Sequence, residues 1–235
     1  MRENVIKFDR TNQPEFFKEL RKRVNTYFKE NGISKYANFN MKFKTGFMIV
    51  LYFVPLILLI SGVISSFGTA LIMWILMGFG MGGIGLSIMH DANHGSYSKI
   101  KIINTLLGKL ILFIGGYSPN WRIQHNVLHH SFTNVDGYDE DIKAPVLRMA
   151  PNQKRKYMHR FQAFYATFFY GIMTMYWSTA KDFLDLYKYK KMDLLKSQGL
   201  TISKAMVELL TNKIVYFVVT LVLPIIMTPI PCMKL

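Results

Sequence analysis

The sequence predicts an all-α integral membrane protein, and three observations lead to this fold class. Of the 235 residues, 51% are hydrophobic and only 18% are charged, a balance that soluble globular domains rarely show. Two uncharged apolar stretches follow one another before residue 90, and each is long enough to cross a hydrocarbon layer of about 30 Å. Lys and Arg outnumber Asp and Glu 29 to 14, as in the cytoplasmic loops of membrane proteins.

Residues 1–44 are predicted to form a cytoplasmic amphipathic region, followed by a membrane domain over 45–235. Within the first region, five apolar residues recur at helical spacing among cations: Phe16, Phe17, Leu20, Val24 and Phe28. This pattern suits a helix on the membrane surface, and equally a helix packed on the cytoplasmic face of the protein itself. The region is polar and mixed in charge, so we expect no cleavable signal peptide there.

The first two spans are predicted as a transmembrane hairpin over 45–66 and 69–89. Pro55 predicts a kink in the first span. The glycine content of the second predicts close helix contact. Phe67 and Gly68 leave room for only a very short turn, which carries no cation, whereas the chain up to Lys44 carries eleven Lys and Arg. The positive-inside rule therefore places the N-terminal region and His90 on the cytoplasmic side.

The next apolar segments are harder to assign to the membrane. Residues 102–117 are short and interrupted by Lys109, which favours a re-entrant or interfacial segment and keeps the chain after it on the same side as His90. Residues 161–180 are long enough to span, but 143–160 and 181–204 each carry six Lys and Arg. An aromatic helix in the interface is therefore favoured over a crossing. A third span is predicted over 214–230.

Five of the six histidines form two spaced groups, each directly after a hydrophobic stretch: His90 and His94, then His125, His129 and His130. A spacing of four places two imidazoles on one face of a helix. Imidazole is a good ligand for iron, zinc, copper and nickel, so the two groups together indicate a metal site. Asp91 could orient one ligating ring through its second nitrogen. Asn93 or Asn126 could act similarly or contact a bound water.

Other polar residues near these groups have simpler interpretations. His159 lies in a run of cations and is expected on a solvated basic surface. An acidic cluster comes after the second histidine group, and a solvated loop is favoured over a role in tuning the site or orienting a donor protein. Its members are Asp136, Asp139, Glu140 and Asp141.

The two histidine groups resemble the histidine boxes of the membrane fatty-acid desaturases. Residues 90–95 of this chain, HDANHG, are similar to the first box of the family. Residues 120–130, NWRIQHNVLHH, with GYDED after them at 137–141, are similar to the second box. Within that family, the two groups resemble the bacterial acyl-CoA and front-end, linoleoyl-CoA-type branch. The resemblance extends along the chain to about Pro231.

The resemblance implies a diiron centre that uses O₂ to introduce a double bond into an acyl-CoA or acyl-lipid chain. His90, His94, His125, His129 and His130 match ligand positions. It also implies a separate electron donor, a ferredoxin or small cytochrome, and a multi-pass protein in a bacterial inner membrane with the boxes facing the cytoplasm. The third box of the family, H/Q-x-x-H-H, does not occur, so we expect a chain truncated before it.

Several alternatives stay open from the sequence. A chain without the third box could be a non-catalytic pseudoenzyme, and related diiron hydroxylases share the boxes. A divalent-metal transporter is disfavoured because 45–66 and 69–89 contain neither acidic residues nor histidine. Nucleic-acid binding is disfavoured because no recognition motif accompanies the positive charge. Cys232 is the single cysteine, so no intrachain disulfide can form.

Overall fold

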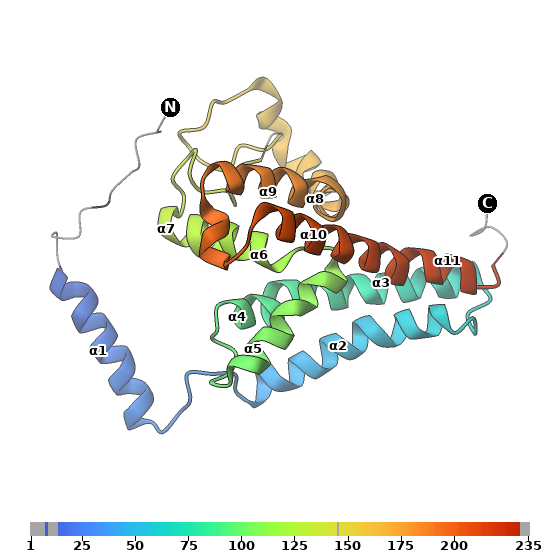
Figure 1. The fold of residues 1–235 in the computed structure, drawn as a ribbon, viewed down its shortest axis with the longest axis horizontal. Helices are drawn as coiled ribbons and strands as arrows, with labels where there is room; N and C mark the ends of the chain where they lie inside the picture. Colours follow the sequence, from blue (N-terminus) through green and yellow to red (C-terminus); the bar gives the residue numbers. More distant parts are fainter. Residues whose placement is uncertain (1–7, 9–13, 145, 231–235) are drawn as a thin grey trace.

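The computed structural model describes residues 8, 14–144 and 146–230, and over these residues it contains helices and no strand (Figure 1). The predicted all-α class is confirmed for the described part of the chain. Three of its helices are long and apolar enough to cross a membrane. The expectations for Pro231, Cys232 and most of the first 13 residues concern positions outside the described residues.

The three candidate spans run side by side along the long axis of the molecule (Figure 1). The first is α2 (Phe39–Ile60). The second, Phe67–Asn93, joins α3 (Phe67–Gly83), a π-helical turn (Ile84–Ile88) and α4 (Met89–Asn93). The third, Ile202–Met227, joins α10 (Ile202–Phe217), a π-helical turn (Val218–Val222) and α11 (Leu223–Met227). Their outward side chains are largely exposed and apolar, as lipid contact requires.

The hairpin forms as predicted, but its turn was placed wrongly. The turn comprises residues 61–66, and Phe67 and Gly68 already belong to α3. Two local features set this boundary: Gly62 adopts a left-handed φ of +75°, and the Ser66 hydroxyl accepts a hydrogen bond from the Thr69 N–H at 3.1 Å. At the other end, the Asn38 side chain caps α2 through the Met41 N–H at 2.9 Å, so α2 begins six residues before the predicted span.

The glycine-rich second span does allow close contact, at one position in particular. A Cβ atom on Gly80 would lie 2.7 Å from the backbone nitrogen of Tyr52 on α2. No real Cβ tolerates such an approach, so glycine is what lets the two backbones meet here. The hydroxyl of Tyr52 also donates to the carbonyl of Phe113, which joins the hairpin to the segment between the two histidine groups.

The third span begins at Ile202, twelve residues before the predicted start at 214. The predicted start was wrong because Glu208 and Lys213 interrupt the apolar pattern without interrupting the helix. Both charges are satisfied inside the protein: Glu208 accepts a hydrogen bond from Tyr117 at 2.8 Å, and Lys213 pairs with a buried carboxylate. The helix can therefore continue through them.

The segment between the histidine groups is bent and does not form a straight crossing. It consists of α5 (Lys101–Gly108), a 3₁₀ stretch (Lys109–Ile114), and then α6 (Ser118–Trp121) with a π-helix (Arg122–His129) and α7 (His130–Phe132). The two arms meet at 105°, and Gly115 at the break has a φ of +81°. This geometry agrees with the expected re-entrant or interfacial segment, because it returns the second histidine group to the end of the molecule that holds the first.

The remaining helices lie outside the three candidate spans. A 3₁₀ turn (Tyr157–Phe161) leads into α8 (Gln162–Tyr176), a π-helical turn (Trp177–Lys181), α9 (Asp182–Lys191) and a 3₁₀ stretch (Leu194–Gln198). α8 is 15 residues long and is not among the three helices that are long and apolar enough to cross a membrane, and its interfacial placement stays a prediction. α1 (Pro14–Glu30) has no buried residue, which leaves its apolar stripe unpacked against the described protein.

Two apolar cores hold this arrangement together. One lies between the hairpin and the bent segment and includes Tyr52, Ile88 and Ile114. The other packs the second histidine segment against α9 and α10 and includes Ile123, Leu186 and Leu209. The first histidine group thus follows a helix that packs in the first core, and the segment with the second group packs mainly in the second core, with Trp121 reaching the first.

Candidate metal centre

The two histidine groups, 31 residues apart in the chain, form one cluster of five rings. His90 and His94 come from the end of the second span, while the π-helix Arg122–His129 and α7 carry the other three. Ring centroids of neighbouring imidazoles lie between 4.6 and 5.4 Å apart. The structure therefore brings together every histidine singled out as a metal ligand, and leaves His159 elsewhere.

The ring nitrogens face one another at spacings that ligands of one metal ion would have. The Nε2 atoms of His90 and His125 are 3.1 Å apart, and those of His94 and His130 are 3.3 Å apart. With metal–imidazole bonds of about 2.1 Å, two ligands separated by 90° to 109° place their nitrogens about 3.0 to 3.4 Å apart. His90, His94 and His125 together offer nitrogens within 4.8 Å of one another.

Carboxylates on the outer side of the rings decide which nitrogen is free. Nδ1 of His90 lies 3.0 Å from Asp91, and Nδ1 of His125 lies 3.2 Å from Asp141. A carboxylate only accepts hydrogen bonds, so in the neutral rings each Nδ1 carries the proton and each Nε2 presents a lone pair. Two lone pairs that face each other at 3.1 Å repel unless a cation lies with them. This arrangement fits a metal site.

Asp139 orients His129, the middle histidine of the second group. Its Oδ1 lies 2.9 Å from His129 Nδ1, and its side chain is fully buried. Burial by itself would raise the pKa of Asp139, but hydrogen bonds from His129 and from the backbone N–H groups of Asn134 and Asp141 outweigh it and lower the pKa. Asp139 therefore stays a carboxylate and keeps the His129 ring in one tautomer.

The acidic cluster is only in part the solvated loop that the sequence favoured, because Asp136 and Asp141 are exposed but Asp139 is buried and Glu140 is half-buried. Besides Asp139 and Asp141, Glu140 pairs with Lys188 and Asp136 accepts from Gln153 at 3.0 Å. The alternative that it tunes the histidine site is the one that the contacts support. The missed signal was the length of the loop, since nine residues after His130 are enough to turn a carboxylate back onto the preceding helix.

Of the suggested outer partners, Asp91 contacts a ring and Asn93 does not. Asn93 is buried, and its Oδ1 accepts from Ser118 at 3.0 Å and Arg122 at 2.9 Å. Asn93 therefore joins the two histidine-bearing segments and makes no hydrogen bond to a histidine ring. The suggested ring contact was wrong for this residue. The Asn126 amide nitrogen donates to the Asn93 carbonyl at 3.1 Å, and its buried Oδ1 has no partner among the described residues.

Trp121 belongs to the site, although the sequence pattern indicated no role for it. Its indole stacks on His125 with a centroid separation of 4.6 Å, and it packs edge-on against His90 and His94. It packs against one side of the cluster. Burial lowers the pKa of His94 to about 4, assisted by the neighbouring rings, so this imidazole is neutral at pH 7, as a metal ligand must be.

A second buried polar cluster, which the sequence pattern did not reveal, supports the start of the second histidine segment. Lys213 Nζ lies 2.6 Å from Asp182 Oδ2 and also donates to the carbonyls of Gly115 and Trp177. Asn120, at the head of the histidine segment, donates to Asp182. Burial raises the pKa of Asp182, and the Lys213 ammonium opposes that change. This ion pair joins α9 and α10 to the segment that carries His125.

Comparison with known proteins agrees with the geometry. The model of the fatty acid desaturase family matches residues 65–230. The sn-1 linoleoyl-lipid 6-desaturase of Arthrospira platensis is 37% identical over 166 residues, which cover 70% of this chain and 45% of that protein. The acyl-lipid (8-3)-desaturase of Physcomitrium patens is 38% identical over 176 residues, or 72% of this chain and 36% of that protein.

A further relative covers more of the chain. The sn-1 linoleoyl-lipid 6-desaturase of Synechocystis sp. is 34% identical over 189 residues, or 80% of this chain and 52% of that protein. No solved structure matches. The chain thus spans about half, or less, of the length of these curated relatives. The family match covers both histidine groups, the bent segment between them and most of the candidate membrane region. By this match and by the resemblance of its two histidine boxes, the chain belongs to the fatty acid desaturase family.

Proposed function

We propose that this chain supplies the first two histidine boxes of an iron-dependent desaturase that introduces a double bond into the acyl chain of a membrane lipid. One observation carries the proposal: the Nε2 lone pairs of His90 and His125 face each other at 3.1 Å while carboxylates hold both Nδ1 protons. Such a pair is arranged to bind a cation.

The proposed ligands are His90, His94, His125, His129 and His130, with Asp91, Asp139 and Asp141 as their outer partners. Bound iron would supply the O₂ chemistry that protein side chains alone cannot perform. The side chains hold the nitrogens in place, and Trp121 packs against one side of the cluster. Five imidazoles fill fewer positions than two six-coordinate irons require, so further ligands are needed for a complete diiron centre.

The substrate class and donor rest on the relatives and on the membrane character of the fold. The relatives named above act, by their names, on lipid-linked acyl chains, which favours acyl-lipid over acyl-CoA here. A separate electron donor, a ferredoxin or small cytochrome, is proposed to bind at the end of the molecule that holds the histidine cluster. A bacterial inner membrane with this end facing the cytoplasm is proposed because the cations gather in the segments at that end.

Iron binding is the first test, because it does not require a complete catalytic cycle. The purified chain is loaded with Fe(II) without oxygen, and bound iron is measured after gel filtration. We expect iron to be retained, to be lost in His125→Ala, and to be unaffected in His159→Ala, which removes the one histidine outside the cluster. Equal retention in both variants would contradict the proposed site.

Lipid analysis is the second test and addresses the reaction. Gas chromatography of fatty acids from a host that expresses the chain, alone and extended by any further coding sequence of its gene, is compared with the His125→Ala counterpart. A new unsaturated acid that depends on His125 supports desaturation. A hydroxylated acid would favour the related hydroxylase reaction. An iron-binding chain with an unchanged profile in both lengths would favour a non-catalytic relative.

A further inference from the structure

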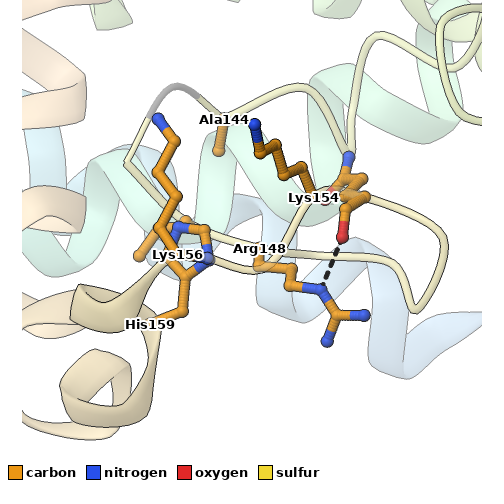
Figure 2. A pocket seen from close by; sticks show the side chains of 7 residues that line it. Ala144, Arg148, Lys154, Lys156 and His159 are labelled. Carbon is orange, nitrogen blue, oxygen red and sulfur yellow. Dashed lines mark hydrogen bonds between the residues drawn. The ribbon is translucent and has the colours of Figure 1, made fainter.

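A second polar site lies in the loop between the acidic cluster and α8, apart from the histidine rings. It is a cavity of about 160 Å³ (Figure 2), lined by Ala144, Leu147, Arg148, Gln153, Lys154, Lys156 and His159. In Figure 2, the Lys154 and Lys156 side chains extend toward the Ala144 end of the pocket. None of the proposed metal ligands lines it.

The charged residues that line this pocket are all cations. No Asp or Glu stands between Asp141 and Asp182 in the sequence, while 143–160 holds six Lys and Arg. Lys154 and Lys156 are exposed and pair with no carboxylate of the described residues. Two unpaired ammonium groups at one cavity attract an anion.

The walls of the pocket are held by hydrogen bonds, so it is a built feature of the loop. Gln162 of α8 accepts from the Arg148 backbone N–H at 2.7 Å and donates back to the Arg148 carbonyl at 3.2 Å. Tyr165 donates to the Val146 carbonyl at 3.0 Å. Gln153 accepts from the Met149 N–H at 2.8 Å. The loop is thereby anchored to α8 on one side and closed on itself on the other.

His159 adds a donor to the pocket. Its Nδ1 accepts the Lys156 backbone N–H at 3.1 Å, so the neutral ring carries its proton on Nε2. The lining therefore offers N–H groups from an imidazole, two ammonium groups and the guanidinium of Arg148, with Arg148 partly occupied by the Gln153 carbonyl. Several donors of this kind suit the oxygens of a phosphate group.

The size of the cavity restricts the ligand. A water molecule occupies about 30 Å³, so about 160 Å³ accommodates a group of a few heavy atoms. Pockets for drug-sized or nucleotide-sized ligands measure about 300–1,000 Å³. The cavity can hold one phosphate group and is too small to enclose the whole head of an acyl-CoA.

The segment after the pocket indicates where that phosphate would be found. Tyr157 is 75% exposed and Phe164 is 84% exposed, and Phe161 and Phe168 also face outward. Aromatic side chains next to cations are typical of the level at which lipid headgroups lie. Arg160 stacks over Tyr157 at 4.6 Å from the ring centre, which keeps one more cation beside this aromatic surface.

We propose that this pocket binds the phosphate of an anionic phospholipid headgroup and so fixes the loop at the membrane surface. Gln153 connects the pocket to the acidic cluster, because its amide donates to Asp136 at 3.0 Å and to the Ile142 carbonyl at 3.2 Å. A bound headgroup would therefore steady the loop that carries Asp139 and Asp141.

The test uses the whole chain in phospholipid nanodiscs, and measures backbone hydrogen exchange of peptides that cover 146–160. Discs of phosphatidylcholine alone are compared with discs that contain phosphatidylglycerol. We expect slower exchange with phosphatidylglycerol. The Lys154→Gln/Lys156→Gln variant should need about tenfold or more phosphatidylglycerol for the same protection, since each cation near a membrane surface contributes to anionic-lipid attraction. Lys190→Gln/Lys191→Gln, which changes the same net charge on the exposed end of α9, is the matched control.

Separate arms identify the source of the phosphate. Inorganic phosphate and coenzyme A at millimolar concentration are added to discs of phosphatidylcholine. Protection by either one alone would overturn the lipid assignment. No protection by phosphatidylglycerol, or equal loss in the Lys190/Lys191 variant, would overturn the pocket. His125→Ala should keep the protection, so this proposal can fail or stand independently of the iron site.

Discussion

Two clusters of charged and polar side chains lie within this largely apolar protein, and they are built in opposite ways. Around Asp182 and Lys213, every donor on the lysine has an acceptor, and the two side chains are only 2% and 7% exposed. In the histidine cluster, the Nε2 lone pairs of His90 and His125 face each other at 3.1 Å without a donor between them. Complete pairing indicates a structural role, whereas unpaired lone pairs in a fixed array indicate a site for a cation.

Removing one half of the buried ion pair should give the largest effect. Lys213→Met leaves the Asp182 carboxylate buried without its partner, and we expect the free energy of unfolding to fall by about 3–5 kcal/mol. Thermal unfolding in detergent measures the change. The double variant Lys213→Met/Asp182→Leu should recover much of it, because replacing both charges removes the buried ion. A double variant as unstable as the single one would contradict a paired structural role.

Changing a buried partner of the histidine cluster should act on metal binding more than on folding. Asp139→Asn keeps the shape but removes the charge that holds His129, and we expect Fe(II) affinity to fall about 10–100-fold. Competition with a chelator of known affinity measures it. The unfolding midpoint of the protein without metal serves as the control. If the midpoint falls while Fe(II) affinity is unchanged, Asp139 belongs with the structural cluster.

Asp91 contacts His90 as Asp139 contacts His129, and we expect it to contribute less to metal binding. Its side chain is 42% exposed, whereas that of Asp139 is fully buried, so water screens its interaction with His90. Asp91→Asn should therefore lower Fe(II) affinity less than Asp139→Asn does, by about tenfold at most. The same chelator competition compares the two variants side by side, and a larger loss for Asp91 would reverse the assigned order.

An exposed ion pair should show the smallest effect. Lys196 and Asp193 lie 2.8 Å apart with side chains 77% and 69% exposed. Lys196→Met is expected to change the free energy of unfolding by at most about 1 kcal/mol, in contrast to Lys213→Met. The same detergent unfolding experiment gives both numbers. Similar losses in the two variants would mean that burial does not explain the importance of the Asp182–Lys213 pair.

Local patterns were enough for the helical class and for the two histidine groups. Spacing of four predicted that His90 and His94, and His125 and His129, share helix faces, and the hydrophobic runs predicted the hairpin. Boundaries were less reliable, because caps such as Asn38 and Ser66 act through single side chains that a hydropathy pattern ignores. The start of the third span was missed because Glu208 and Lys213 find partners 31 or more residues away.

The sequence by itself determined which elements could enter a membrane and which side chains could bind a metal, because both depend on residue type and short-range spacing. Only the tertiary structure decided that the five imidazoles meet, that Asp139 and Asp141 hold two of them, and that Lys154, Lys156 and His159 share a pocket. Those contacts join segments through the packing of separate cores and the bend at Gly115. Distances between residues far apart in the chain are set by such packing, and a local sequence pattern cannot predict them.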